Sequence, residues 1–380
     1  MKPKAQLTFS LFDEIPEIKT SNSQVKINKT KFLEFAQQLK TSSTLLILRN
    51  KIIEIKNILL NSTINSDLIV SSAKTNSETI EFNQACLLED LNQIKDSLTL
   101  ERAIYYVERL EKGVTSVKTS DINNINLNRW KEYDDILTDS LWLLDKRDSS
   151  GVHSAGYWGN FIPQIPNQMM KRYTKKGEWV LDTFAGCGTT LIEAQRLGRN
   201  CLGIELQANI AEKATGFISA EPNRYSTTWK IFNDDSTNTD YKSALESLRI
   251  KSVQLVIMHP PYFDIIKFSD DLRDLSNAAS VDSFLSMLKN VAANAASVLD
   301  KGRYLILVIG DKYAGGDWIP LGFLAMNEIL NLGFSLKSIV VKNFEDTTGK
   351  RSQKDLWRYR ALAGGFYIFK HEYIFILKKK

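Results

Sequence analysis

Two short segments of the sequence carry residue types at spacings that suit chemistry. In the first, residues 182–190 read DTFAGCGTT. The glycines let the backbone approach a ligand closely, and a helix starting at Thr189 would offer free N–H groups. Glu205 follows about 20 residues later, where a carboxylate can accept both hydroxyls of a ribose. The pattern predicts a nucleoside-cofactor site built from Asp182, Phe184, Gly186, Gly188, Thr189 and Glu205.

Other phosphate-binding loops do not match this turn. Residue 191 is Leu, so the dinucleotide spacing Gly-x-Gly-x-x-Gly is absent, and no Gly-Lys-Ser/Thr follows. A plain structural turn is the alternative for a lone Gly-x-Gly. Asp234 or Asp235, after the segment WKIF at 229–232, lies where such folds contact an adenine. We select Asp234 as a cofactor-binding candidate, with a solvated turn as the alternative.

The second segment reads MHPPY at residues 258–262, directly after the apolar run VQLVI. Two prolines fix the backbone, so that a carbonyl group and the preceding side chain point into one small volume. An aromatic ring beside that volume can stack on a planar substrate. The candidate catalytic residues are His259, Pro260, Pro261 and Tyr262.

The elements that must position these segments alternate from Asp134 onward. Apolar runs typical of strands lie at 179–182, 201–204, 252–258, 304–309, 338–341 and 367–377, with helical patterns between most of them. This alternation predicts a mainly parallel, doubly wound α/β sheet. The carboxyl ends of its strands form a ligand crevice, which would bring both segments together.

The N-terminal part of the sequence has a different pattern of apolar residues. Apolar residues at helical spacing cover residues 29–61 and 82–112, separated by Ser, Thr and Asn, and no repeat of 20–50 residues is apparent. We predict a flexible N-terminus over 1–28, a mainly helical region over 29–125, and a catalytic domain over 130–380. The helical region would serve target recognition or oligomerisation.

Composition limits the class of protein. Among 380 residues, 43% are hydrophobic and 24% charged, as in ordinary soluble globular proteins. No apolar stretch approaches the roughly 20 residues needed to span a bilayer, and no secretory signal is visible. Three cysteines and three histidines make a disulfide framework or a metal site improbable. We expect neither a membrane nor a metal as partner, and a reducing cytoplasm as the compartment.

Positive charge gathers near the C-terminus. The formal net charge is +5, and residues 342–380 hold ten Lys or Arg against four acids. Interleaved aromatic residues make this segment a candidate polyanion surface, while a solvated strand edge carrying lysines is the alternative. The best phosphate-contact candidates are Arg351, Lys354, Arg358 and Arg360.

The order of these motifs resembles the S-adenosylmethionine-dependent DNA amino-methyltransferases of restriction–modification systems, which methylate cytosine N4 or adenine N6. The resemblance covers about residues 135–380. It includes GNFIPQIPNQ at 159–168, in the place of the family's extra cofactor motif, and FYIFKHEYIF at 366–375, similar to its last strand pair. It implies a Rossmann-like methyltransferase sheet with a terminal antiparallel strand, S-adenosyl-L-methionine as cofactor, double-stranded DNA as substrate and a cognate restriction endonuclease as candidate partner.

The resemblance also implies a mechanism with one departure. The target base leaves the duplex stack, Tyr262 stacks on it, and the Pro260 carbonyl and the side chain at 259 accept the amine's hydrogens. The family has Asp, Asn or Ser where this chain has His259. A neutral imidazole can accept a hydrogen bond but an imidazolium cannot, so with an ordinary pKa of about 6.5 transfer should fall in mild acid.

Three functions follow from this reading. The first is methylation of an exocyclic amine in DNA, with cytosine N4 slightly favoured over adenine N6 because the acidic Asp is missing. The second is methylation of an RNA base. The third is a catalytically silent DNA-binding subunit with a methyltransferase fold, because His259 replaces the usual acceptor.

Overall fold

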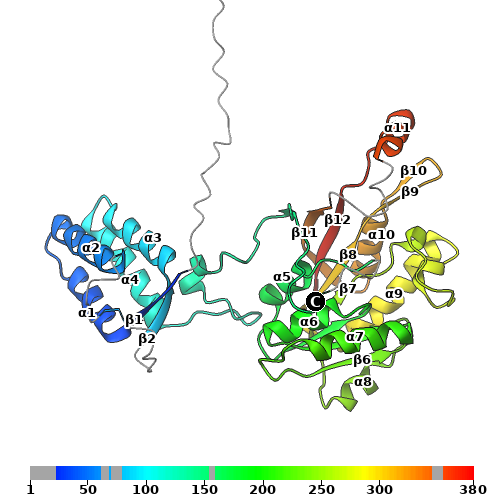
Figure 1. The fold of residues 1–380 in the computed structure, drawn as a ribbon, viewed down its shortest axis with the longest axis horizontal. Coiled ribbons are helices and arrows are strands. Elements are labelled where there is room, and N and C mark those ends of the chain that lie inside the picture. The colour runs from blue at the N-terminus through cyan, green and yellow to red at the C-terminus, as the bar shows by residue number, and fades with distance from the viewer. Residues whose placement is uncertain (1–22, 61–67, 70–78, 154–158, 345–353) are drawn as a thin grey trace, which may run out of the picture. The chain divides into compact units, whose positions relative to one another are not determined.

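The structure is a computed structural model that describes residues 23–60, 68–69, 79–153, 159–344 and 354–380. The chain divides into two compact units (Figure 1). The N-terminal unit comprises described residues up to Lys118 together with 126–133, and the C-terminal unit comprises 119–125 and 134–380. The chain therefore crosses between the units three times around residues 118–134.

The described residues of the N-terminal unit form two strands and four α-helices, followed by a 3-10 helix. They are β1 (Gln24–Asn28), α1 (Lys29–Lys40), α2 (Leu45–Leu60), β2 (Thr79–Asn83), α3 (Gln84–Lys95), α4 (Leu100–Thr115) and η1 (Leu127–Glu132). The helical spacing over 29–61 thus belongs to two helices and not one. Hydroxyl groups cause the break, because Ser42 Oγ donates to the Gln38 carbonyl at 3.1 Å and Thr44 Oγ1 accepts from the Ile47 amide at 3.3 Å.

The two halves of this unit repeat each other at an offset of 55 residues. Each half has a strand of 5 residues, a helix of 12 and a helix of 16. Strands β1 and β2 pair antiparallel with Lys26 opposite Glu81, its equivalent in the repeat. The unit is therefore an internal duplication with a local pseudo-two-fold axis through the centre of the ribbon, at a period beyond the 20–50 residues considered above.

Equivalent positions share their structural roles more than their residue types. The first helix of each half is capped by an asparagine, since Asn28 accepts from the Lys31 amide and Asn83 from the Ala85 and Cys86 amides. The buried positions of these helices also match, as Phe32 with Leu87, Ala36 with Leu91 and Leu39 with Ile94. The repeat is therefore visible in which positions are buried or cap a helix, and not in sequence identity.

The C-terminal unit is built on an eight-stranded sheet in the order β3-β11-β12-β8-β7-β4-β5-β6. Its strands are β3 (Leu141–Trp142), β4 (Trp179–Asp182), β5 (Asn200–Glu205), β6 (Trp229–Asn233), β7 (Val253–Met258), β8 (Leu299–Ile309), β11 (Phe334–Asn343) and β12 (His371–Lys379). Strand β12 runs antiparallel to both β8 and β11, and the other pairs are parallel. The predicted sheet with a terminal antiparallel strand is confirmed.

Helices cover both faces of this sheet. They are α5 (Gln164–Tyr173), α6 (Thr189–Leu197), α7 (Ala208–Ala220), α8 (Tyr241–Ser247), α9 (Val281–Val298) and α10 (Leu321–Leu330). Helix α11 (Lys354–Gly364) projects away from the sheet, and its described side chains are largely exposed (Figure 1). Strand β7 alternates between two cores: Val256 and Met258 pack with α8, α9 and α10, while Leu255 and Ile257 pack with α5, α6 and α7. The doubly wound arrangement predicted from the sequence is confirmed.

Short elements follow the carboxyl ends of β7 and β8. Two 3-10 helices, η2 (Phe263–Ile265) and η3 (Leu275–Asn277), lie in the connection after β7, and the hairpin β9 (Lys312–Ala314) and β10 (Asp317–Ile319) follows β8. Within the described part of the chain, no helix has the length and apolar character to cross a membrane.

Candidate active site

The glycine turn after β4 has the backbone that the sequence predicts. Gly186 and Gly188 have φ of +50° and +82°, in the left-handed region that favours glycine. A side chain on Gly188 would come within 2.9 Å of Ile218 Cδ1 in α7. The Ala185 amide donates to the Ile204 carbonyl at 2.8 Å, which ties the turn to β5. The turn is thus fixed by backbone geometry.

Glu205, at the end of β5, is buried against this turn. Its Oε2 accepts from the Gly186 amide and its Oε1 from the Gln207 amide, both at 2.9 Å. Burial raises the pKa of the Glu205 carboxyl, while these two amides act in the opposite direction. Each carboxylate oxygen keeps a further lone pair, so the group can still accept hydrogen bonds from a diol.

Asp182 lies beneath the turn and is fully buried. Its Oδ1 accepts from the Phe184 amide at 2.9 Å, and burial raises its pKa to about 6. Asp182 therefore supports the start of the turn from behind. Gly188 and Thr189, at the beginning of α6, are likewise behind the surface that a ligand would touch.

An open cleft of about 770 Å³, counting the space at its mouth, runs along the carboxyl ends of β4, β5 and β7. Residues from both predicted segments line it: Phe184, Gly186, Glu205, His259, Pro260 and Pro261. The structure brings the glycine turn and the His-Pro-Pro segment to one cavity.

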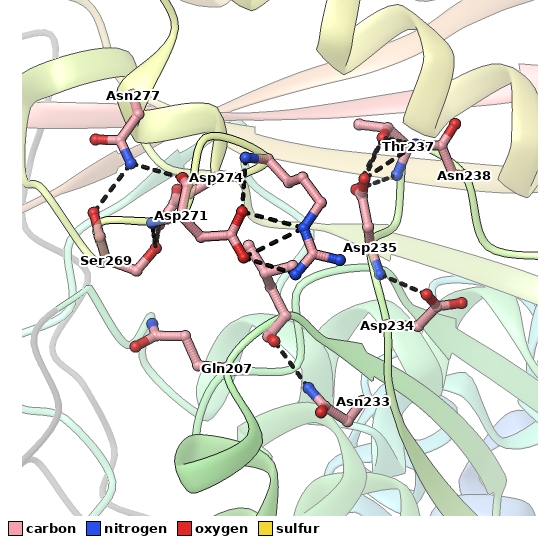
Figure 2. Close-up of polar contacts among 12 residues, drawn as sticks. Gln207, Asn233, Asp234, Asp235, Thr237, Asn238, Ser269, Asp271, Asp274 and Asn277 are labelled. Atoms are coloured by element: carbon pink, nitrogen blue, oxygen red, sulfur yellow. Dashed lines mark hydrogen bonds and ion pairs between the residues drawn. The ribbon is translucent and has the colours of Figure 1, made fainter.

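The acidic residue of this cleft after β6 is Asp235 (Figure 2). Its carboxylate is buried and accepts from Thr237, through both the amide and the hydroxyl, and from Asn238 Nδ2. Asp234 is exposed, accepts from the Asp235 amide at 2.8 Å and does not line the cleft. We predicted Asp234 as the cofactor-binding residue, but the structure places its neighbour Asp235 in the cleft.

The loop between η2 and η3 borders the same cleft and is held by its own side chains (Figure 2). Asn277 Nδ2 donates to the carbonyls of Ser269 and Asp271 at 2.9 and 2.8 Å. Ser269 Oγ donates to Asp274 Oδ2 at 2.7 Å. The loop adds Phe268, Arg273, Asp274 and Leu275 to the cleft.

His259 belongs to a chain of polar contacts that reaches into the sheet. Its Nε2 lies 3.1 Å from Tyr262 Oη, and that hydroxyl donates to Glu372 Oε2 at 2.8 Å. Glu372 pairs with Lys342 Nζ at 3.2 Å, and both side chains are largely buried. Phe161 stacks on the imidazole with ring centroids 4.7 Å apart.

These contacts determine which nitrogen of His259 carries the proton. A tyrosine hydroxyl has one proton, and here the Glu372 carboxylate accepts it. Tyr262 Oη must then accept from Nε2–H of His259, which leaves Nδ1 unprotonated and able to accept a hydrogen bond. His259 is thus held as one neutral tautomer.

The charge state of His259 differs from our expectation. Burial lowers the pKa of His259 to about 4; the Glu372 carboxylate raises it and the Lys342 ammonium lowers it further. The ordinary value of about 6.5 therefore does not apply, and the imidazole is neutral throughout the physiological range. The predicted loss of the acceptor in mild acid is corrected accordingly.

Tyr262 is placed differently from a stacking platform. Its hydroxyl is engaged by Glu372, its ring packs so closely on Gly310 that an added Cβ there would lie 3.0 Å from Tyr262 Cε2, and it does not line the cleft. Sequence reasoning missed Glu372 and Lys342, which stand opposite each other on β12 and β11. Both residues lie far from His259 in the sequence, so no local motif indicates that they belong to the site.

The candidate phosphate contacts are only partly described. Arg358 and Arg360 are exposed on α11, and the Arg360 guanidinium lies 5.3 Å from the centroid of the Trp357 ring. Arg351 lies outside the described residues, as does the side chain of Lys354.

Comparisons with known proteins agree with this geometry. A family model described as DNA methylase, of the N6 and N4 type, matches residues 26–216 and 253–380. Type II methyltransferase M.BglI of Bacillus subtilis is 28% identical over 135 residues, or 34% of this chain and 36% of its own length. M2.DpnII of Streptococcus pneumoniae is 32% identical over 90 residues, or 22% of this chain and 34% of its own. The chain spans between 12 and 36% of the curated relatives it matches.

Solved structures are similar at low identity. A SAM-dependent methyltransferase from Methanosarcina mazei is 13% identical with a TM-score of 0.36, and the match covers 58% of this chain and 98% of the other. Magnesium protoporphyrin IX methyltransferase from Synechocystis is 14% identical with a TM-score of 0.33, and covers 54% of this chain and 71% of the other.

Proposed function

The chain belongs to the N6/N4 DNA methylase family, and from that premise we propose that it transfers a methyl group to an exocyclic amine of a DNA base. One observation carries the proposal. The glycine turn with Glu205 and the segment His259-Pro260-Pro261 line the same cleft, so a cofactor and an amine acceptor site adjoin.

The residues of the cleft fit S-adenosyl-L-methionine. Glu205 offers a buried carboxylate for the ribose hydroxyls, and Phe184 and Gly186 form the wall beside it. Asp235 and Asp274 add negative charge around the cleft, which favours a cationic ligand. When bound, the cofactor supplies an activated methyl group on sulfur. We assign Asp182, Gly188 and Thr189 to supporting the turn.

The acceptor side is assigned to His259 and Pro260. The target base leaves the duplex, and its amine donates one hydrogen to His259 Nδ1 and the other to the Pro260 carbonyl. Both acceptors are neutral, so they orient the amine's lone pair without removing a proton first, and catalysis is mainly positioning. A neutral acceptor in place of a carboxylate supports cytosine N4 as the slightly favoured target over adenine N6.

Tyr262 is assigned to holding His259 rather than to stacking on the base. Stacking in the cleft would require its hydroxyl to leave Glu372 and His259. Arg358 and Arg360 are assigned to DNA phosphates, because both are exposed on α11 beside aromatic side chains. A cognate restriction endonuclease remains part of the proposal through the family alone.

The deciding experiment uses S-adenosylmethionine with a labelled methyl group, offered with either duplex DNA or RNA. The nucleic acid is then digested to nucleosides, which are separated and identified by mass spectrometry. We expect the label in DNA as N4-methylcytosine, and N6-methyladenine would correct only the base. Label confined to RNA would replace the substrate, and DNA binding without any label would identify a silent subunit.

A further inference from the structure

The antiparallel ribbon β1–β2 of the duplicated N-terminal unit has no role in the site described above. We propose that this ribbon enters the major groove of DNA and reads base edges, which makes the N-terminal unit the part that selects the target sequence. The inference rests on the proposed function, because it assumes duplex DNA as the substrate.

The ribbon separates apolar from polar side chains by strand alternation. Val25, Ile27, Ile80 and Phe82 face the four helices and belong to the core of the unit or pack against it. The opposite face carries Gln24, Lys26, Thr79 and Glu81, since successive side chains of a strand point to opposite sides. Figure 1 shows the ribbon along one side of α1 to α4.

These outward side chains remain accessible in the described structure. Gln24 is exposed, the Glu81 side chain is 56% exposed and the Lys26 side chain 25% exposed. The described contacts at the ribbon's edges leave this face alone, since Ile69 bridges to Ile27 on the β1 side and Arg129 donates to the Glu81 carbonyl on the β2 side. The edges are covered while the polar face is presented.

The residue types on this face match the chemistry of base edges. The major groove admits a two-stranded ribbon, and there Lys pairs with guanine, Gln with adenine, Glu with the cytosine amino group and Thr with either polar edges or a thymine methyl. Such readout requires side chains that leave one partner for another. The Lys26–Glu81 ion pair, at 3.3 Å and partly exposed to solvent, is weak enough to be exchanged.

Charge distinguishes the two halves of the repeat. The first half, 24–60, has seven basic residues against two acidic ones, and the second, 79–115, has four against seven. Lys29 and Lys31 flank the ribbon at the start of α1. Phosphate contacts should therefore concentrate on the first half, which docks the unit in one orientation although its fold is nearly symmetric.

The asymmetry also predicts the kind of sequence that is read. A ribbon with a true two-fold axis would read a palindrome, because equivalent residues would meet equivalent bases. Here the residues on either side of the axis are Lys26 and Glu81. The central bases under the ribbon should accordingly differ between the two strands, and the target should be asymmetric at that position.

The test exchanges the central pair in the full chain. The double variant Lys26→Glu with Glu81→Lys keeps the net charge and the cross-strand ion pair. The matched control is Lys40→Glu with Glu111→Lys, which reverses a 2.7 Å pair between α1 and α4 away from the ribbon. Parent and variants each select from a randomised 20-bp duplex library, and bound sequences are read.

We expect the parent to enrich an asymmetric sequence, the control to enrich the same one, and the ribbon exchange to enrich a different one or lose selection at least tenfold. Thermal melting checks that the variants fold, and Gln24→Ala, which leaves the ion pair intact, should lose discrimination at one base pair. An unchanged sequence after the ribbon exchange overturns the proposal, as does a parent without preference. An altered oligomeric state by sedimentation would instead make the ribbon a contact between copies.

Failure of the proposed function appears in a different measurement. If the parent selects DNA in the library but transfers no labelled methyl group, the ribbon inference stands and the enzymatic assignment falls. If methyl transfer to DNA occurs while the ribbon exchange leaves selection unchanged, the enzymatic assignment stands and the ribbon inference falls.

Discussion

The two halves of the cleft are built in different ways. The half that we assign to the cofactor lies between Asp182 and Glu205, and its main contacts are made by backbone amides held by glycine geometry. The acceptor half depends on side chains, because His259 is held by Tyr262, which in turn is held by Glu372, 110 residues further along the chain. The first half is fixed by the local backbone conformation. The second is fixed by the protonation state of His259 and by side chains from strands that are distant in the sequence. Substitutions should therefore affect affinity in the first half and rate in the second.

The largest effect is expected for His259→Ala. Loss of the amine acceptor should reduce single-turnover methylation by about 100- to 1,000-fold, the cost of removing one preorganised hydrogen-bonding group at a reacting centre. Calorimetric affinity for S-adenosylmethionine should stay within a few-fold of the parent. His259→Asn, which restores an acceptor, should recover most of the rate. A variant His259→Ala as fast as the parent would remove the side chain from the mechanism.

Glu205→Ala tests the cofactor half. A hydrogen bond to a charged group is worth about 1.5–3 kcal/mol, so S-adenosylmethionine should bind about 10- to 100-fold more weakly. At saturating cofactor the rate of transfer should largely return. Glu212→Ala, at an exposed position of the neighbouring α7, is the control and should bind as the parent does. Equal affinities in both variants would contradict the assignment of Glu205.

Tyr262→Phe separates positioning from packing. The ring remains, but His259 loses the partner that fixes its tautomer, and the rate should fall about tenfold, equivalent to roughly 1.4 kcal/mol. Tyr373→Phe is a matched control, because Tyr373 Oη donates to Asp311 Oδ2 at 3.2 Å beside His371. Nitrogen-15 NMR of the imidazole should show the Nε2–H tautomer in the parent and control and a mixture in Tyr262→Phe. The same single tautomer in all three proteins would contradict the role of the Tyr262 hydroxyl in fixing the His259 tautomer.

A smaller effect is expected on α11. Replacing Arg358 and Arg360 by Ala should weaken DNA binding a few-fold at every sequence. The slope of log affinity against log salt should flatten by about 1.8, since each phosphate contact contributes about 0.9. Fluorescence anisotropy with matched and unrelated duplexes measures both quantities. A slope equal to that of the parent would move the phosphate contacts to another surface.

The smallest expected change concerns pH. Because His259 has a pKa of about 4, the single-turnover rate at saturating cofactor should stay nearly constant from pH 8 to pH 5. The folded state binds this proton less readily than the unfolded state, whose pKa is about 6.5, so stability should decline as pH falls from 6.5 toward 4. His259→Asn should lack that part of the decline in melting temperature. A halving of the rate near pH 6.5 would contradict the buried, neutral imidazole.

The same contrast explains what the sequence could predict. The glycine turn and the His-Pro-Pro segment were identified because a few adjacent residues determine each of them. Glu372 and Lys342 were not, since their position beside Tyr262 depends on the register of β12 between β8 and β11. Asp234 and Asp235 differ in burial only because the chain turns between them, and residue type alone does not distinguish the two.

The duplication in the N-terminal unit escaped sequence reading for a related reason. Its two halves share caps such as Asn28 and Asn83 and serines such as Ser42 and Ser97, but the core residues change in size from one half to the other. A fold preserves the positions that are buried, while many apolar residues satisfy each one. The structure shows instead that the two halves have the same elements, of equal length, at a constant offset.

The central place of β12 sets an order of assembly. Strands β4 to β8, which hold the cofactor turn, hydrogen-bond with one another, whereas β11 and β3 join the sheet only through β12. Residues 371–379 must therefore pair with the edge of β8, alongside β11, before Glu372 reaches Tyr262. Non-local strand pairing of this kind is slow, so under the proposed function the half assigned to the cofactor should form before the half assigned to the amine acceptor is complete. Activity would thus report completion of the fold.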